Sequence, residues 1–142
     1  MQEDLIKARQ LLLTGSFTYV LCRGSEVRTG TARGVRPLVD LMEEGSFSGF
    51  CAADKVVGKA TAFLYVLLGV RAIYTPVVSE SALDVLRAHG IDIFYDLAVP
   101  GIFNRSRTGF CPMETAVRDI RDPQAALAAI RDALEKMLHH KN

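Results

Sequence analysis

The feature of this sequence that most restricts its fold is an alternation of helix and strand patterns in its middle. Residues 54–68 are apolar around most of a helical circumference, which predicts a helix buried against a sheet. Residues 71–78 and 91–95 have the pattern of strands, and residues 79–89 have that of a helix between them. Successive strands joined by a helix pair in parallel through a right-handed crossover. The sequence therefore predicts an α/β fold.

The N-terminal third predicts a helix followed by a hairpin. Residues 3–13 place their apolar side chains on one helical stripe. Residues 17–22 are apolar on both faces, and residues 26–29 alternate more weakly, so the first strand should be central and the second nearer an edge. A short helix is expected to begin near Pro37 and end at Gly45.

The C-terminal third predicts a loop and two helices. Residues 96–111 show no periodicity, which is typical of a functional or an unstructured loop, although residues 99–103 have the composition of a short edge strand. A short helix is expected over residues 112–120, and Asp122 and Pro123 begin the last one. A chain of 142 residues without repeats predicts a single domain over residues 1–142.

Composition excludes several classes of protein. A chain that is 49% hydrophobic can form a core without disulfides or metals. A net charge of +1 provides no general field for nucleic acid or an anionic membrane, so neither is expected as a partner. Three widely spaced cysteines are typical of a reducing compartment, and the longest uncharged apolar run, residues 60–70, is too short to span a bilayer. We therefore expect a cytoplasmic protein.

The first candidate site comprises Asp54, Lys55 and Lys59, at the start of the helix expected over residues 54–68. The two lysines would share one helix face, where they repel each other and oppose the helix dipole, at a cost of up to about 1 kcal/mol each. Such local conflicts are typical of functional sites. The lysines would then face an anionic ligand or a carboxylate such as that of Asp54 or Glu114. The alternative is a pair of solvated lysines.

The second candidate site is the loop and helix entry over residues 104–114. Asn104, Arg105 and Thr108 supply polar donors, and Glu114 lies in the first turn of a helix that begins at Pro112. Arginines and free helical amides together stabilise phosphate or carboxylate. The spacing matches no phosphate-loop signature, and a merely solvated loop is the alternative.

Cys111 lies at the expected start of that helix, where the dipole favours a thiolate. A nucleophile would also need a base. His89 closes a helix, and the other histidines lie in the C-terminal tail, so a cysteine–histidine pair is not favoured. Two other interpretations remain open. Glu114 can complete a capping box at this helix start, and Cys111 can be a small buried apolar side chain.

The order helix, hairpin, helix, strand, helix, strand resembles the cytidine deaminase-like fold, a three-layer α/β/α sandwich with a mixed sheet. In that fold, zinc deaminases place H-x-E and P-C-x-x-C at the starts of two helices. The corresponding segments here are residues 52–54 and 76–79, which lack histidine and cysteine; Asp54 is the only nearby acid and Cys51 the only nearby cysteine. With Cys51 as the one possible nearby ligand, the three-ligand requirement of a catalytic zinc is not met, and we expect neither a metal nor another cofactor.

The strings GFCAADKVVGKATAFLYVLLGV, IYTPVVSE and VPGIFNRSRTGFCPMETAV are similar to those of domain-of-unknown-function family 1893. This resemblance covers nearly the whole chain and implies the zinc-free variant of the fold, with an N-terminal hairpin and parallel later strands. It implies no activity. The wider fold includes an accessory protein that handles sulfur through cysteine, which draws attention to Cys51 and Cys111.

These patterns lead to one expectation and one alternative. We expect a small anionic ligand, a nucleotide or phosphorylated metabolite, at the carboxyl edge of the sheet. If the site is catalytic, Cys111 is the nucleophile or sulfur carrier, Lys55 or Lys59 stabilises its thiolate, and Asp54 orients it. The alternative is a non-catalytic interaction or regulatory module that forms a homodimer through the last helix, whose apolar stripe is Leu127, Ile130, Leu134 and Met137.

Overall fold

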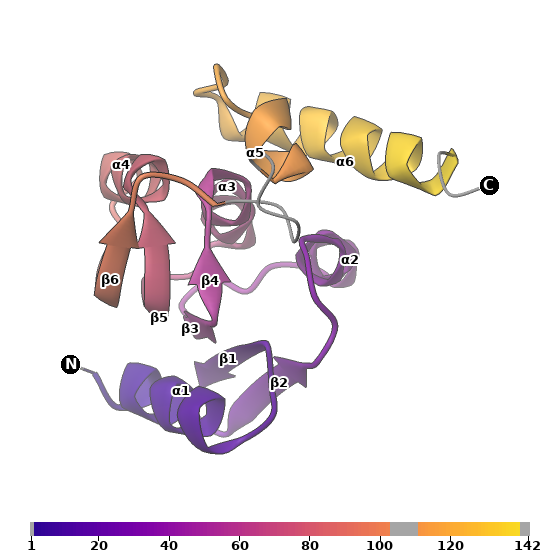
Figure 1. Cartoon of the computed structure of the whole chain (residues 1–142). Helices are drawn as coiled ribbons and strands as arrows, with labels where there is room; N and C mark the ends of the chain where they lie inside the picture. Colours follow the sequence, from indigo (N-terminus) through magenta and orange to yellow (C-terminus); the bar gives the residue numbers. More distant parts are fainter. Residues whose placement is uncertain (1, 103–110, 140–142) are drawn as a thin grey trace.

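The structure is a computed structural model, and it describes residues 2–102 and 111–139. In this part of the chain six helices surround one mixed sheet of six strands (Figure 1). The helices are α1 (Glu3–Thr14), α2 (Arg36–Glu44), α3 (Lys59–Leu68), α4 (Glu80–Ala88), α5 (Pro112–Ala116) and α6 (Pro123–His139). The strands are β1 (Tyr19–Arg23), β2 (Glu26–Gly30), β3 (Cys51–Asp54), β4 (Val56–Val57), β5 (Ala72–Ser79) and β6 (Asp92–Val99).

The sheet combines an antiparallel hairpin with parallel strands. β1 pairs antiparallel with both β2 and β3, whereas β3, β4 and β6 all pair parallel with β5. Strands β3 and β4 lie on one side of β5, and β6 lies on the other. The expected central first strand, edge second strand and parallel crossover through α4 are all confirmed.

Helices cover both faces of the sheet (Figure 1). α1 packs against β1, β3 and β5 on one face, through Leu5, Ala8 and Leu12. On the other face α4 contacts β5 and β6, and α3 lies beside it, with α2, α5 and α6 packed around α3. Phe63 and Tyr65 of α3 are completely buried, which is worth about 1.5–3 kcal/mol for each large apolar side chain. The apolar character of α3 is thereby explained.

The helix expected from residue 54 begins instead at Lys59, which is a correction to the first candidate site. Residues 51–57 form β3 and β4, and Lys55 interrupts them as a one-residue irregularity whose amide donates to the Thr18 carbonyl at 3.1 Å. Gly58 is extended and precedes the helix. The β-branched Val56 and Val57 favour strand structure, which outweighs the apolar spacing that suggested a helix.

Two further boundaries differ from expectation. β6 runs to Val99, longer than the strand expected over residues 91–95, and takes in the first residue of the edge strand expected over residues 99–103. α5 ends at Ala116, not at residue 120. Asn104, Arg105 and Thr108 of the second candidate site lie outside the described residues.

In the described part of the chain, no helix combines the length and the hydropathy that crossing a bilayer requires.

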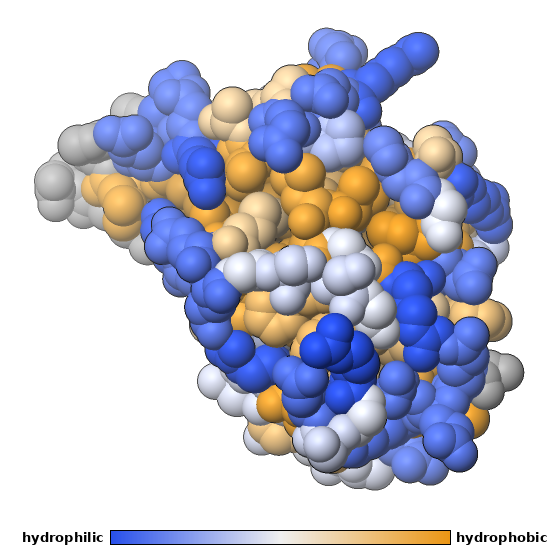
Figure 2. Space-filling model, turned by 180° about the vertical axis from the view of Figure 1, so that it is seen from behind, coloured by the Kyte–Doolittle hydropathy of each residue, from blue (hydrophilic) through white to orange (hydrophobic). Residues whose placement is uncertain are grey.

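Several large apolar side chains remain on the surface. Phe94, Tyr95 and Leu97 of β6 are more than one-third exposed, as are Met137 and Leu138 near the end of α6. Seen from behind, the molecule shows a broad area of hydrophobic side chains bordered by polar ones (Figure 2).

Candidate functional site

A half-buried carboxyl, that of Asp54, lies where β3 ends, at the carboxyl edge of the parallel strands. Asp54 is paired in the sheet with Tyr19, the first residue of β1. Its Oδ2 accepts a hydrogen bond from the Tyr65 hydroxyl of α3 at 2.6 Å, and its Oδ1 accepts from the Val56 amide at 3.4 Å. Strand pairing and the buried face of α3 together fix this carboxyl in place.

Burial sets the protonation of this pair. It raises the pKa of Asp54 from 3.8 to about 7, although the hydrogen bonds from Tyr65 and from the Val56 and Lys55 amides oppose the shift. Burial, followed by the nearby Asp54 charge, raises the pKa of Tyr65 well above its ordinary value of 10. Tyr65 is therefore protonated near pH 7, whereas Asp54 titrates there. A carboxyl with this pKa can gain and lose a proton at neutral pH.

A groove of about 370 Å³ lies between the hairpin and α2, beginning beside Tyr19. We call it the arginine groove, and it is lined by Tyr19, Arg28, Ala32, Arg33, Arg36, Pro37, Asp40, Leu41 and Glu44. Arg28 forms two hydrogen bonds to Glu44, at 2.6 and 2.9 Å. Arg33 and Arg36 are exposed, and neither forms an ion pair with a described residue. The groove thus offers two guanidinium groups that the fold does not neutralise.

Tyr19 connects the groove to Asp54. Its sheet partners are Gly30 of β2 and Asp54 of β3. The Tyr19 ring lies against Gly30, where a Cβ would overlap ring carbons and the hydroxyl. Burial raises the pKa of Tyr19, so its hydroxyl is a hydrogen-bond donor at neutral pH.

Glu114 contacts the start of α3, so the second candidate site partly meets the first. Its Oε1 accepts from the Lys59 amide at 3.0 Å, and its Oε2 accepts from the Ala60 amide at 3.2 Å. Gly58 leaves room for this contact, because a Cβ there would lie 2.5 Å from Oε1. A carboxylate of the chain itself therefore satisfies the first amides of α3.

The two predicted lysines do not share a helix face, because Lys55 precedes the helix. The Lys59 ammonium donates to the Arg118 carbonyl at 2.7 Å and lies 5.9 Å from the centre of the Phe63 ring. The Lys55 side chain is exposed. The structure thus brings Lys59 to Glu114 and leaves Lys55 apart from them.

Cys111 occupies the N-cap position of α5 without a side-chain capping hydrogen bond, and it is half-buried. Its amide donates to the Ile102 carbonyl at 2.9 Å. The capping box, which was one of the open interpretations of Glu114, does not form, because the Glu114 carboxylate accepts hydrogen bonds from the first amides of α3 instead. Cys22 and Cys51 are fully buried, and burial raises the pKa of both thiols. Within the described ranges, no three cysteine, histidine or acidic side chains are grouped as a metal would require.

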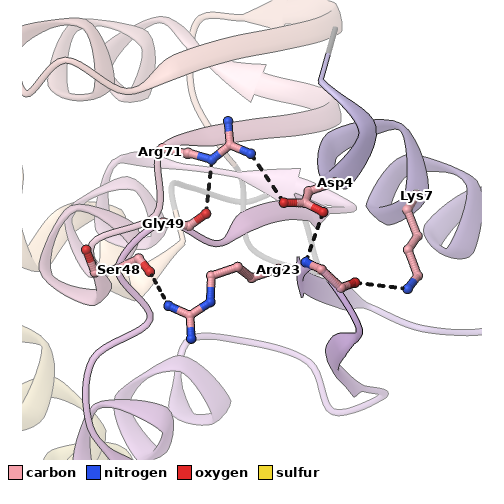
Figure 3. Close-up of polar contacts among 7 residues, drawn as sticks. Asp4, Lys7, Arg23, Ser48, Gly49 and Arg71 are labelled. Carbon is pink, nitrogen blue, oxygen red and sulfur yellow. Dashed lines mark hydrogen bonds and ion pairs between the residues drawn. The ribbon is translucent and has the colours of Figure 1, made fainter.

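A second polar cluster lies at the opposite end of the parallel strands, where β3 and β5 begin, and it joins α1 to the sheet (Figure 3). Asp4 accepts from the Gly24 amide at 3.1 Å and from Arg71 at 3.3 Å. Arg71 also donates to the Gly49 carbonyl at 3.0 Å, and Lys7 donates to the Gly24 carbonyl at 3.3 Å. All these groups have partners within the chain, so the cluster is structural.

Sequence reasoning missed the arginine groove and both tyrosines. Tyr19 and Tyr65 sit in apolar strand and helix patterns, where a tyrosine is indistinguishable from core. The arginines gave a usable signal, because Arg28, Arg33 and Arg36 fall within nine residues that also contain glycines. That density of guanidinium groups near turns indicates an anion site more directly than the lysines do.

Comparison with known proteins agrees with this architecture. A crystal structure of a DUF1893 family protein from Thermotoga maritima, at 2.70 Å resolution, matches with a TM-score of 0.83 and 25% identity, over 96% of this chain and 92% of that chain. No curated protein is similar enough to count as a match. The family model of this domain of unknown function matches residues 7–134. The chain therefore belongs to the DUF1893 family.

Proposed function

We propose that this protein binds a small anionic metabolite, such as a nucleotide or a phosphorylated metabolite, in the arginine groove. The observation that carries the proposal is the presence of Arg33 and Arg36 in this groove without an ion-pair partner among the described residues. The guanidinium fork matches phosphate and carboxylate oxygens in two-point contacts.

The charges of the groove favour an anion. Arg28 is neutralised by Glu44, so Asp40 is the one remaining carboxylate in the lining against Arg33 and Arg36. The volume of about 370 Å³ lies within the range of small-molecule sites. Because the net charge of the chain is only +1, attraction of the ligand depends on these two side chains.

Asp54 supplies the acid–base group if the bound ligand reacts. It lies next to Tyr19 in the sheet, and Tyr19 lines the groove. With a pKa of about 7, its carboxyl can serve as a general base or acid at neutral pH. We keep Lys55 as a further cation near the carboxyl edge of the sheet, since its side chain is exposed.

The remaining predicted residues give a second, separate part of the proposal. Lys59 and Glu114 have partners inside the chain, so their proposed role in ligand binding requires those contacts to open. Cys111 remains the proposed nucleophile or sulfur carrier. It directly precedes α5, and Glu114 of α5 bonds the start of α3, which supports a position of Cys111 near the carboxyl edge of the sheet.

The finer fold assignment has support from the arrangement of the helices. α1 on one face of the sheet and α3 with α4 on the other are what a three-layer sandwich of cytidine deaminase type requires. The strand order, with the hairpin on one side and parallel strands on the other, agrees with it. One continuous core that includes parts of α2, α3, α4 and α6 supports a single domain.

Calorimetric titration with inorganic phosphate and with adenosine monophosphate, at low ionic strength, tests the groove. The double variant Arg33→Gln, Arg36→Gln should bind at least about tenfold more weakly, the effect of losing roughly 1.5 kcal/mol of charged hydrogen bonding. Arg131→Gln, an exposed arginine of α6, is the matched control and should bind like the wild type. Equal affinity in the double variant and the wild type would reject the site, as would no binding to the wild type.

A non-catalytic homodimer is the second candidate function. Leu127 and Ile130 of the predicted stripe are buried in the chain's own core, whereas Met137 and Leu138 are 42% and 58% exposed. Only the end of α6 is therefore available for a helix pair. If α6 forms the dimer, light scattering should report a dimer that Leu138→Lys converts to a monomer; a wild-type monomer at all concentrations would contradict it.

A further inference from the structure

We propose that the outer edge of β6 binds an extended segment of another protein that carries basic side chains, which adds a strand to the sheet. β6 lies at the edge of the sheet (Figure 1), and no described strand pairs with its outer side. A strand in this position presents a row of unpaired amides and carbonyls. The inference is independent of the arginine groove, which lies at the hairpin side of the sheet.

β6 lacks most of the features that normally protect an edge strand. Natural edges are usually short, or carry charged side chains (especially lysine), proline or a bulge. The charged side chains of β6 are Asp92 and Asp96. β6 is eight residues long and contains no lysine, arginine or proline. β2, the strand at the other edge, has five residues, and Arg28 in it is held by Glu44. The two edges therefore differ in how readily they accept a further strand.

A hollow lies beside this edge on the face that carries α1. Its volume is about 540 Å³, and Arg9, Tyr74, Phe94 and Asp96 contribute to its lining. It exists because α1 packs against β1, β3 and β5, which leaves the same face of β6 uncovered. Side chains of an added strand would enter the space next to Phe94, which is 39% exposed.

The charges around the edge identify the partner as basic. Asp92 and Asp96 are exposed, and neither forms an ion pair with a described residue. Asp96 accepts from the Tyr74 hydroxyl at 2.5 Å through Oδ2, which leaves Oδ1 available. Arg9 lies over the Tyr74 ring, 5.0 Å from its centre. Pairing of two β6 strands would bring four carboxylates together without a basic residue from either strand, which disfavours a second copy as the occupant.

The spacing of the carboxylates predicts a pattern for the partner. Alternate residues of a strand share a face, so Asp92, Phe94 and Asp96 point to the same side. Their complement is a basic residue, an apolar residue and a second basic residue at alternate positions, with the bases about 13 Å apart. Because the order acid, aromatic, acid is the same in both directions, this pattern fits a parallel or an antiparallel partner.

The test uses a capped peptide that contains the segment Lys-Thr-Val-Thr-Lys. Fluorescence anisotropy measures its binding to the full chain, and amide hydrogen exchange of the full chain locates the strand that it protects. The peptide should bind and slow exchange in β6 but not in β2. A Glu-Thr-Val-Thr-Glu peptide should bind at least tenfold more weakly, and a backbone N-methylated lysine peptide should not bind. Equal binding of the lysine and glutamate peptides, or tight binding of the N-methylated one, would overturn the proposal.

Variants of the protein separate the two edges. Phe94→Lys should weaken lysine-peptide binding at least tenfold, whereas Val27→Lys on β2 should leave it unchanged; these side chains are 39% and 37% exposed. Asp92→Asn is the second test, for use if Phe94→Lys impairs folding. Because Asp92 is exposed, this substitution should leave the fold intact and still weaken binding of the lysine peptide. Unchanged binding in a folded Phe94→Lys or in Asp92→Asn contradicts the proposal, as does concentration-dependent protection of β6 without any peptide, which indicates self-pairing.

Discussion

The carboxylate of Glu114 accepts a hydrogen bond from the backbone amide of Lys59 at 3.0 Å, across 55 positions of the chain. With the second bond to the Ala60 amide, it places a negative charge at the N-terminus of α3, where the helix dipole is positive. An anionic ligand would have to displace this carboxylate to reach the same amides. The occupied helix start is one physical reason to favour the arginine groove as the anion site.

Replacing Glu114 should destabilise the fold. Glu114→Ala leaves two amides of α3 without their partner, and losses of capping side chains cost about 1–2 kcal/mol. Glu114→Gln keeps one acceptor oxygen and should cost less. Urea unfolding measures both, with Glu43→Gln, an exposed glutamate of α2, as the control. An Ala variant as stable as this control would show that the contact contributes nothing.

The order of the elements was predictable except for β3 and β4, because each of the others has a strong local signal. Pro37 and Gly45 delimit α2, and the apolar strand β1 is central as its two-sided pattern indicates. The start of α3 was not predictable from spacing alone. Val56 and Val57 satisfy the helical pattern, and their position in a strand depends on pairing with β5, which is a long-range interaction.

The candidate site was predictable only in part, for a related reason. Asp54 was identified, because it is the single acid near the start of an apolar stretch. Its altered pKa arises from burial and from Tyr65, eleven residues later, which no local pattern connects to it. Arg33 and Arg36 gain significance only because folding leaves them without carboxylate partners among the described residues.

Asp54 should make stability depend on pH. Its pKa is raised from 3.8 to about 7, so the folded state holds a proton that the unfolded state has lost across this interval. The stabilising contribution is fully present below about pH 4 and is lost as the pH rises through about 7. Compared with Asp54→Asn, the wild type should therefore lose stability between pH 5 and pH 8.

Urea unfolding of both proteins at these two pH values measures the effect. Other titrating groups are common to both proteins, so the difference between them isolates Asp54. Asp84→Asn, an exposed aspartate of α4, is the matched control and should follow the wild type. The difference in unfolding free energy between the wild type and Asp54→Asn is the quantity compared. If it stays constant, or grows in favour of the wild type as the pH rises, Asp54 is not protonated in the folded state.

The fold should require glycine at position 30 because the Tyr19 ring lies against it. A Cβ at position 30 overlaps the Tyr19 ring, so Gly30→Ala should destabilise the protein by about 1–3 kcal/mol through forced displacement of that ring. In a Tyr19→Ala background the same substitution should cost much less, since the ring is absent. A double-mutant cycle of unfolding free energies measures this coupling. Additive effects of the two substitutions would mean that the strain arises elsewhere.

Asp4 should control how firmly α1 is held to the sheet. It joins the helix to the Gly24 turn and to Arg71, and the ion pair is partly exposed, so the hydrogen bonds contribute most of the effect. Asp4→Asn should cost about 0.5–1.5 kcal/mol and speed amide exchange in α1 more than in α3. Glu3→Gln removes the same charge from the same helix turn without breaking these contacts, so it separates the network from the helix dipole. If both variants accelerate exchange in α1 equally, the charge at the helix start is responsible and the bridge to Gly24 and Arg71 is not.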